Sequence, residues 1–168
     1  MISKNSDMGK ITTPIAVIIV IIFAVIVVNY PGLINNDIVT VNESDNPTIC
    51  FNDNSDCFRI ELATTSEQMS QGLMYRKSLD PDKGMLFIFG QEGIYPFWMK
   101  NTLIPLDIIW IDEDMTVVYI KGNAQPCGPL PCPYITPDHD ARYVLEINGG
   151  LADQIGLEVG DKTIINYL

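Results

Sequence analysis

The sequence predicts a mostly β domain, an antiparallel sandwich or barrel-like fold with one or two short helices, preceded by a single transmembrane helix. Three observations predict it. An uncharged run, Ile11–Val28, is followed by an acidic remainder. The segment Phe58–Thr64 alternates apolar and polar side chains, as a half-buried strand does. Beyond it, short apolar segments are separated by turn-forming residues and few helical patterns intervene.

The first of these elements, residues 11–30, is long enough to cross a bilayer once. At about 1.5 Å rise per residue, a helix over Ile11–Val28 spans roughly 27 Å, and Asn29 and Tyr30 bring it close to the roughly 30 Å hydrocarbon core. A cleaved signal peptide, which has a shorter apolar region, and a buried core helix are the alternatives. We interpret the segment as an uncleaved anchor.

The charges around the anchor predict its orientation. Lys4 and Lys10 precede it, whereas the first charges after it are acidic. By the positive-inside rule, residues 1–10 are cytoplasmic and the rest of the chain is extracytoplasmic. A polar, turn-rich tether over residues 31–49 leads to a β-rich domain over residues 50–168. The expected location is a cell membrane, crossed once.

The strongly acidic composition limits the partners of the exported part. Residues 31–168 carry 20 of the 21 acidic and 8 of the 10 basic residues, a net charge near −12. Such a charge repels phosphate backbones and anionic lipid headgroups. We therefore expect no nucleic acid partner, and an unidentified surface ligand or protein instead.

Four cysteines, Cys50, Cys57, Cys127 and Cys132, all lie on the exported side. Oxidising surroundings favour disulfides, and the sequence leaves the pairing open between two local loops and two long-range links. Free thiols or a four-thiolate metal site are the alternatives. The six residues between Cys50 and Cys57 exceed the usual two to four between paired zinc ligands, and no metal or other cofactor is expected.

A short helix is predicted after the first alternating strand. Two overlapping capping boxes, Thr64 with Glu67 and Thr65 with Gln68, start it, and it runs to about Leu73. A turn over residues 80–84 follows, and then a buried strand over Met85–Phe89. Further strands are expected at Pro96–Lys100, Leu106–Ile111, Thr116–Lys121, Arg142–Asn148 and Thr163–Tyr167, with a hairpin turn at Asp112–Asp114 and another turn at Gly149–Gly150.

Several motifs occur in the order that one known family shows. They are Gly72–Arg76, Gly84–Phe89, the long block Phe97–Asp112, Tyr143–Gly150, Gly156 and Gly160–Asp161. On these motifs, residues 58–166 resemble the domain of unknown function family 192, also called uncharacterised protein family 0127. The resemblance implies a mostly β, sandwich-like fold, often exported or membrane-anchored, with no established activity. The membrane anchor, the tether and the cysteines look like additions to the family core.

Two groups of polar residues are the candidate site. Arg76, Trp98, Lys100, Asn101 and Thr102 can form a cleft in which an aromatic ring and several donors hold an anionic or hydroxyl-rich ligand. Two carboxylates, Asp107 and Glu146, stand in apolar sequence, where burial penalises an unpaired charge. The alternative is structural, with Asp107 or Glu146 paired to Lys100, Arg76 or Arg142 across neighbouring strands.

These observations favour a non-catalytic binding or assembly module at the cell surface, with no catalytic residue assigned. An enzyme acting on envelope carbohydrate is the alternative, and it needs Asp107 and Glu146 in one cavity. Copper or redox handling by the sulfur atoms of methionines is third, although core packing explains these residues better. The methionines are Met74, Met85 and Met99, and the chain's one histidine, His139, lies in a polar loop.

Overall fold

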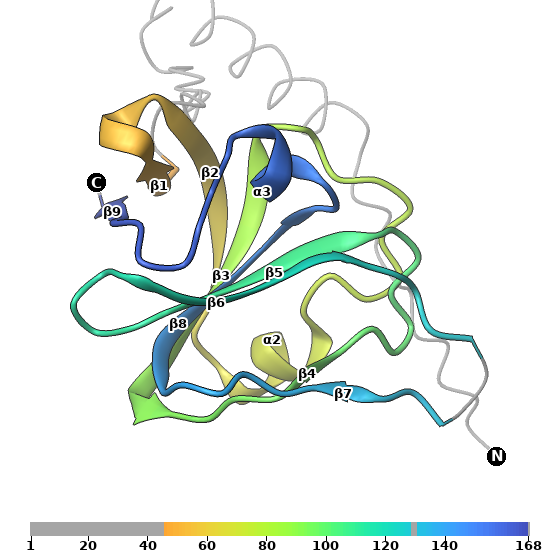
Figure 1. Cartoon of the computed structure of the whole chain (residues 1–168). Coiled ribbons are helices and arrows are strands. Elements are labelled where there is room, and N and C mark those ends of the chain that lie inside the picture. The colour runs from red at the N-terminus through yellow and green to blue at the C-terminus, as the bar shows by residue number, and fades with distance from the viewer. Residues whose placement is uncertain (1–45, 129–130, 168) are drawn as a thin grey trace, which may run out of the picture. The chain divides into compact units, whose positions relative to one another are not determined.

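The computed structural model describes residues 46–128 and 131–167. Figure 1 shows a curled seven-stranded sheet with strand order β6-β5-β8-β3-β2-β1-β9, and a separate two-stranded ribbon of β4 and β7. The elements are β1 (Thr48–Phe51), the 3-10 turn η3 (Asn52–Asn54), β2 (Asp56–Ala63), α2 (Ser66–Gln71), β3 (Lys83–Gly93), β4 (Phe97–Trp98), β5 (Leu106–Ile111), β6 (Val117–Ala124), β7 (Tyr134–Ile135), β8 (Ala141–Asn148), α3 (Leu151–Gln154) and β9 (Ile164–Asn166).

The mostly β class and the two short helices are confirmed, but the antiparallel sandwich is wrong. Strands β2 and β3 are parallel neighbours, with Arg59 opposite Lys83 and Ala63 opposite Phe87. The physical reason is the connection between them, residues 64–82, which contains α2 and is long enough to return the chain to the same end of the sheet. The result is one mixed, half-barrel sheet with a short ribbon beside it.

The helix α2 begins where the sequence predicts. The Thr65 hydroxyl accepts from the Gln68 backbone N–H at 3.3 Å, and the Gln68 side chain accepts from the Thr65 N–H at 3.0 Å. Of the two overlapping boxes, this pair forms the reciprocal cap. The helix ends at Gln71 because Gly72 follows with φ at +49°, a conformation that glycine adopts without a steric penalty.

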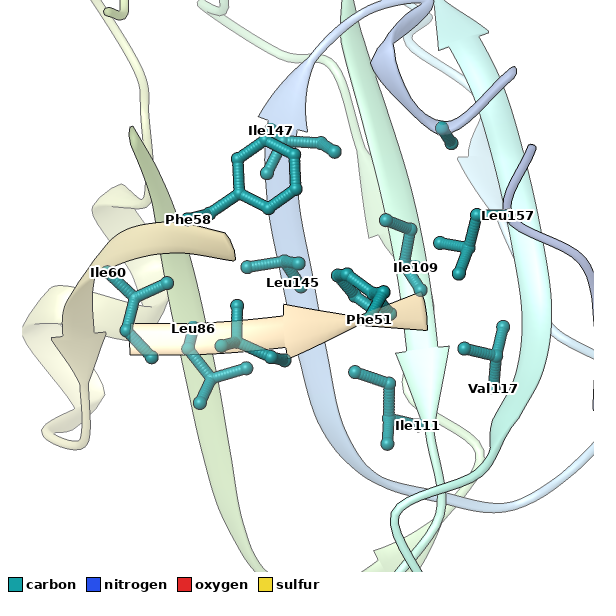
Figure 2. Packing of buried hydrophobic residues seen from close by; sticks show 12 residues of the cluster. Phe51, Phe58, Ile60, Leu86, Ile109, Ile111, Val117, Leu145, Ile147 and Leu157 are labelled. Atoms are coloured by element: carbon teal, nitrogen blue, oxygen red, sulfur yellow. The ribbon is translucent and has the colours of Figure 1, made fainter. Parts of the chain in front are cut away.

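Each face of the sheet has its own apolar core. Alternation along β5 sends Ile109 and Ile111 to one core and Ile108 and Trp110 to the other. Figure 2 shows the first core, where Phe51 and Phe58 of the amino-terminal hairpin cover Leu145 and Ile147 of β8, among others. In Figure 1, α3 lies over this first face and α2 over the second.

The first described strand, β1, lies between β2 and β9. Thr48 pairs with Arg59 on one side and with Asn166 on the other, although Asn166 is far along the chain. The strand begins inside the segment that the sequence assigns to the tether, and Ile49 is fully buried in the first core. The proposed anchor over residues 11–30 lies outside the described residues. Within the described ones, no helix has the length and hydropathy that a membrane crossing requires.

The structure joins the cysteines in two local pairs. Cys50 and Cys57 face each other across the β1–β2 hairpin, with their Cα atoms 4.1 Å apart. Cys127 and Cys132 are also bonded, shortly before β7. Both bonds close short loops, so neither fastens distant parts of the sheet. This result selects one of the pairings that the sequence left open.

Candidate functional site

A cavity of about 180 Å³ lies on the sheet face that α2 covers. Its walls come from residues 69–74 of α2 and the following loop, from strand β3, and from residues 95–98 at the entry to β4. Thr102 and Glu146 complete the lining. Since an engineered cavity of roughly 150 Å³ in another protein binds benzene, this one has room for a ring-sized group.

Aromatic rings form much of the wall. Phe87 and Phe97 meet edge to face with centroids 4.9 Å apart, and Phe89 stacks on Tyr95 at 3.6 Å. The backbone carbonyl of Tyr95 accepts from the Trp110 ring N–H at 2.8 Å, which ties this segment to the sheet. These contacts hold the rings in fixed positions, so the apolar wall is formed before any ligand arrives.

Glu146 of β8 is the carboxyl group among the described residues that line this cavity. Its side chain is buried, and the backbone N–H of Leu73 donates to the carboxyl. Its other oxygen, Oε2, has no hydrogen-bond partner among the described residues. Burial raises the pKa of Glu146 to about 8, and the Leu73 N–H and the positive charge of Arg76 only partly oppose this. At pH 7 the group is therefore mostly a neutral carboxylic acid.

Gly72 leaves the space above this carboxyl. A Cβ atom at Gly72 would lie 3.6 Å from Glu146 Oε2 and 3.1 Å from the ring of Phe87. Its positive φ further disfavours any other residue. The glycine thus ends α2 and also keeps a side chain out of the cavity.

The structure divides the predicted cleft residues. Trp98 and Thr102 line the cavity, and Thr102 is buried. Lys100 lies outside the lining, with its ammonium 4.8 Å from the centre of the Trp98 ring. Trp98 also stacks on Tyr134 with centroids 5.1 Å apart, so the ring that lines the cavity is part of a small stack.

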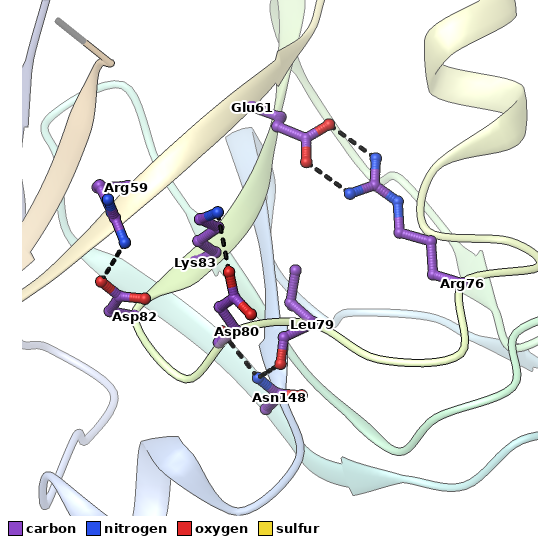
Figure 3. A network of polar contacts seen from close by, with 8 residues as sticks. All are labelled: Arg59, Glu61, Arg76, Leu79, Asp80, Asp82, Lys83 and Asn148. Carbon is purple, nitrogen blue, oxygen red and sulfur yellow. Dashed lines mark hydrogen bonds and ion pairs between the residues drawn. The ribbon is translucent and has the colours of Figure 1, made fainter. Parts of the chain in front are cut away.

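Arg76 and Asn101 hold loops in place at this end of the sheet. Figure 3 shows the two-pronged contact of Arg76 with Glu61 of β2, in which one pair of atoms lies 2.7 Å apart. This hydrogen bond lowers the pKa of Glu61. Asn101 donates from its side chain to the Tyr75 hydroxyl at 2.7 Å, and its carbonyl accepts from the Tyr75 N–H.

Tyr75 and Asn101 both have positive φ, at +64° and +57°. Such backbone conformations are strained in residues other than glycine and persist where neighbouring contacts hold them. Here the two strained residues bond to each other across the loops that flank the cavity.

Asp107 is buried, but no cation pairs with it in the described part of the chain. Its Oδ1 accepts from the N–H groups of Asn123 and Gly150, and its Oδ2 accepts from the N–H of Ala152, all within 2.8 Å. The predicted ion pair with Lys100, Arg76 or Arg142 is therefore wrong for Asp107. Three backbone donors satisfy the carboxyl instead. Two of them, at Gly150 and Ala152, belong to the start of α3, which has no side-chain cap of its own.

The turn at Gly149–Gly150 is confirmed, because the chain bends there from β8 into α3. A Cβ atom at Gly149 would come within 2.9 Å of Pro105 and of the Asn123 side chain. Only glycine fits this close approach, which places the Gly150 N–H against Asp107.

The two buried carboxyls lie on opposite faces of the sheet. In the pairing of β5 with β8, Asp107 is opposite Ile147, and Ile108 is opposite Glu146. Directly paired residues share a face, whereas successive residues alternate. Asp107 and Glu146 cannot reach one substrate together, so the two-carboxylate mechanism of a carbohydrate-acting enzyme is wrong for this pair.

The remaining sequence candidates contribute less. Met85 and Met99 are buried in the second core, and Met74 lines the cavity. His139 is exposed and lies against Asp138. In residues 46–128 and 131–167, no group of three or more His, Cys, Asp or Glu side chains comes together as a metal site.

The sequence profile of DUF192, a family described as an uncharacterized ACR, matches residues 48–165. This is well over half of the chain. The chain belongs to this family. The motifs that suggested the resemblance, Gly72–Arg76 and Tyr143–Gly150 among them, supply the cavity rim, Glu146 and the turn after it.

Relatives of the chain include proteins without an assigned role. A UPF0127 protein of Thermococcus sibiricus is 27% identical over 109 residues, which are 62% of this chain and 64% of that protein's length. A solved structure of a protein of unknown function from Novosphingobium aromaticivorans is 39% identical, with a TM-score of 0.64, and the match covers 70% of this chain and 82% of that one. A Sinorhizobium meliloti protein, named as a candidate transcription regulator, is 36% identical with the same TM-score and coverage of 71% and 91%.

Sequence reasoning missed most of the cavity wall in this DUF192 domain. Tyr95 and Phe97 stand beside Trp98 in an aromatic cluster, and this local composition was a usable signal. Met69 of α2 and Leu73, just after the helix, lie four residues apart and both line the cavity, which is also readable from spacing. Phe87 and Phe89 gave no signal, because a continuous apolar strand does not reveal which residue borders an empty space.

Proposed function

We propose that this DUF192 domain is a non-catalytic binding module that takes a small ligand into the cavity under α2. The observation that carries the proposal is Glu146 Oε2, a buried polar atom without a partner that borders an aromatic cavity. A buried oxygen without a hydrogen bond is costly, so a ligand that supplies one gains affinity there. The rings around it supply apolar contact.

The lining favours some ligands over others. The described residues around the cavity include no Lys or Arg, so nothing on the wall attracts an anion. Of the two ligand classes that the sequence suggested, the hydroxyl-rich one suits Glu146 and the anionic one does not. The ligand in this proposal has an apolar, ring-sized body and one polar group that bonds to Glu146.

A neutral probe tests the binding role. Benzyl alcohol carries one ring and one hydroxyl, and a fragment of this size is expected to bind with a Kd of about 1 mM. In the full-length chain, NMR shifts should change at the amides of Leu73, Phe97 and Glu146. The amides of Asn123 and Gly150, on the opposite face, serve as the control. Shifts at the control amides alone contradict the proposal, as does the absence of any shift at about 10 mM with this probe and with other one-ring probes of its size.

The proposed location is the outer side of a membrane, with residues 11–30 as the anchor. The uncharged run and the two disulfides of the domain support it. Protease added to intact cells should then degrade the carboxyl-terminal domain. Protection in intact cells that is lost on permeabilisation would show the opposite orientation.

A further inference from the structure

The charge around the cavity is one-sided. Among the described residues that line it, Glu146 and the Tyr95 phenol are the ionisable groups. The Tyr95 hydroxyl donates to the Gln91 carbonyl at 2.8 Å, so it is already engaged. Glu146 is thus the group in the lining that can form an ion pair with a ligand.

We infer that the ligand is a small organic cation, an ammonium group on an apolar body, whose N–H donates to Glu146 Oε2. This rests on the proposed function, because it names the class of ligand for the same cavity. A primary ammonium has three donors and no acceptor, and Oε2 is an oxygen that no described group donates to.

The walls suit a cation as well as an apolar group. The faces of aromatic rings attract ammonium ions, and five aromatic residues line this cavity: Phe87, Phe89, Tyr95, Phe97 and Trp98. The thioethers of Met69 and Met74 add polarizable contacts. A neutral polyol would gain less from these rings, because it carries no positive charge for the ring faces to attract.

The wider electrostatics point the same way. The basic group whose charge acts on Glu146 is Arg76, and Arg76 is held by Glu61 through both of its terminal nitrogens. The negative charge of Glu61, which is not in the cavity lining, compensates the positive charge of Arg76. The net charge near −12 of residues 31–168 also raises the local concentration of cations over anions.

Binding a cation changes the protonation of Glu146. Burial raises the pKa of Glu146 to about 8, so at pH 7 the free protein holds a proton there. When the ammonium binds, the carboxyl loses this proton to solvent, the ligand keeps its own protons, and an ion pair forms. The positive charge of Arg76 lowers the pKa of Glu146, and the Tyr95 phenol is the other ionisable group among the described lining residues. Affinity should therefore rise with pH from about 5 to 8, by up to tenfold per unit.

Three probes of similar shape distinguish a cationic, a neutral and an anionic ligand: benzylammonium, benzyl alcohol and benzoate. With the full-length chain at pH 7, we expect benzylammonium to bind at least tenfold more tightly than benzyl alcohol, and benzoate more weakly than both. Calorimetry in two buffers of different ionisation enthalpy should show the release of nearly one proton per benzylammonium bound. Glu146→Gln should abolish the proton release and the preference, whereas Glu158→Gln, an exposed control on the other face, should retain both.

The outcomes distinguish the two proposals. Equal or tighter binding of benzyl alcohol at the cavity amides, without proton release, overturns the cation and leaves the binding module intact. Failure of all three probes to shift the cavity amides overturns both. Should Glu146→Gln fold poorly, the pH dependence of benzylammonium affinity in the unaltered chain decides, and a flat profile from pH 5 to 8 refutes the inference.

Discussion

Asp107 and Glu146 are buried carboxyls on adjacent central strands, and they differ in what surrounds them. Asp107 has three backbone N–H donors and holds the start of α3. Glu146 has one backbone donor, a free oxygen and an aromatic cavity in front of it. Burial alone therefore does not indicate a binding site. The difference lies in whether the fold itself supplies every hydrogen bond that the buried group can make.

The largest effect is expected at the satisfied carboxyl. Asp107→Ala leaves three backbone N–H groups without an acceptor, and at about 1 to 3 kcal/mol each this should lower the free energy of unfolding by about 3 to 5 kcal/mol. Asp107→Asn keeps one accepting oxygen and should lose about 2 kcal/mol. Urea denaturation measures both, with the exposed Asp153→Ala as control. A loss below about 1 kcal/mol for Asp107→Ala would show that its hydrogen bonds do not hold α3.

The second effect concerns the unsatisfied carboxyl and depends on pH. The folded-state pKa of Glu146, about 8, lies above its ordinary value of 4.5, so the folded state keeps a proton that the unfolded state releases between these values. The stability of the unaltered chain should therefore fall as the pH rises from about 5 to 8. Relative to Glu146→Gln, which does not titrate, the fall approaches about 1.4 kcal/mol per pH unit. Parallel stability curves for the two proteins would contradict the raised pKa.

The third effect compares the glycine beside each carboxyl. Gly72 and Gly150 both have positive φ, so an alanine at either should cost about 1 kcal/mol through backbone strain. The new Cβ meets Phe87 and Glu146 at Gly72, whereas at Gly150 it meets open space. Gly72→Ala should therefore weaken benzylammonium binding at least tenfold, and Gly150→Ala should leave it unchanged. Equal binding by the two variants would place the ligand elsewhere.

The smallest effect is expected at Lys100. Its contact with the Trp98 ring is exposed enough to be worth only about 0.5 kcal/mol, and its ammonium lies outside the cavity lining. Lys100→Ala should shift the melting temperature by only a degree or two and leave probe binding unchanged. A large loss of binding would show that Lys100 contributes to ligand binding, as the sequence suggested.

Local patterns predicted much of the sheet. The limits of β5 agree with the predicted Leu106–Ile111, and the Thr65–Gln68 box starts α2 as expected, because capping and alternation depend on nearby residues. The parallel pairing of β2 with β3 and the pairing of β1 with β9 were missed. Both join segments through distant backbone hydrogen bonds, which leave no periodic trace in either segment.

The site was predicted in part for the same reason. Glu146 was chosen because a charge is unusual in apolar sequence, and Trp98 because its ring stands beside several hydrogen-bond donors. Whether Glu146 has a partner depends on Leu73, Gly72 and Phe87, which reach it from other elements. The opposite facing of Asp107 follows from the register of β5 against β8, and a one-residue slip would have reversed it.

The position of β1 between β2 and β9 determines when, during synthesis, the sheet can be completed. Residues 48–51 leave the ribosome early, but their second partner, at residues 164–166, comes more than a hundred residues later. During that interval one edge of β1 has no neighbouring strand to hydrogen-bond with. Such an unpaired edge can pair with strands of other chains. The Cys50–Cys57 bond ties this strand to β2. A chain shortened before Ile164 would therefore be prone to aggregate even though its cavity residues are all present.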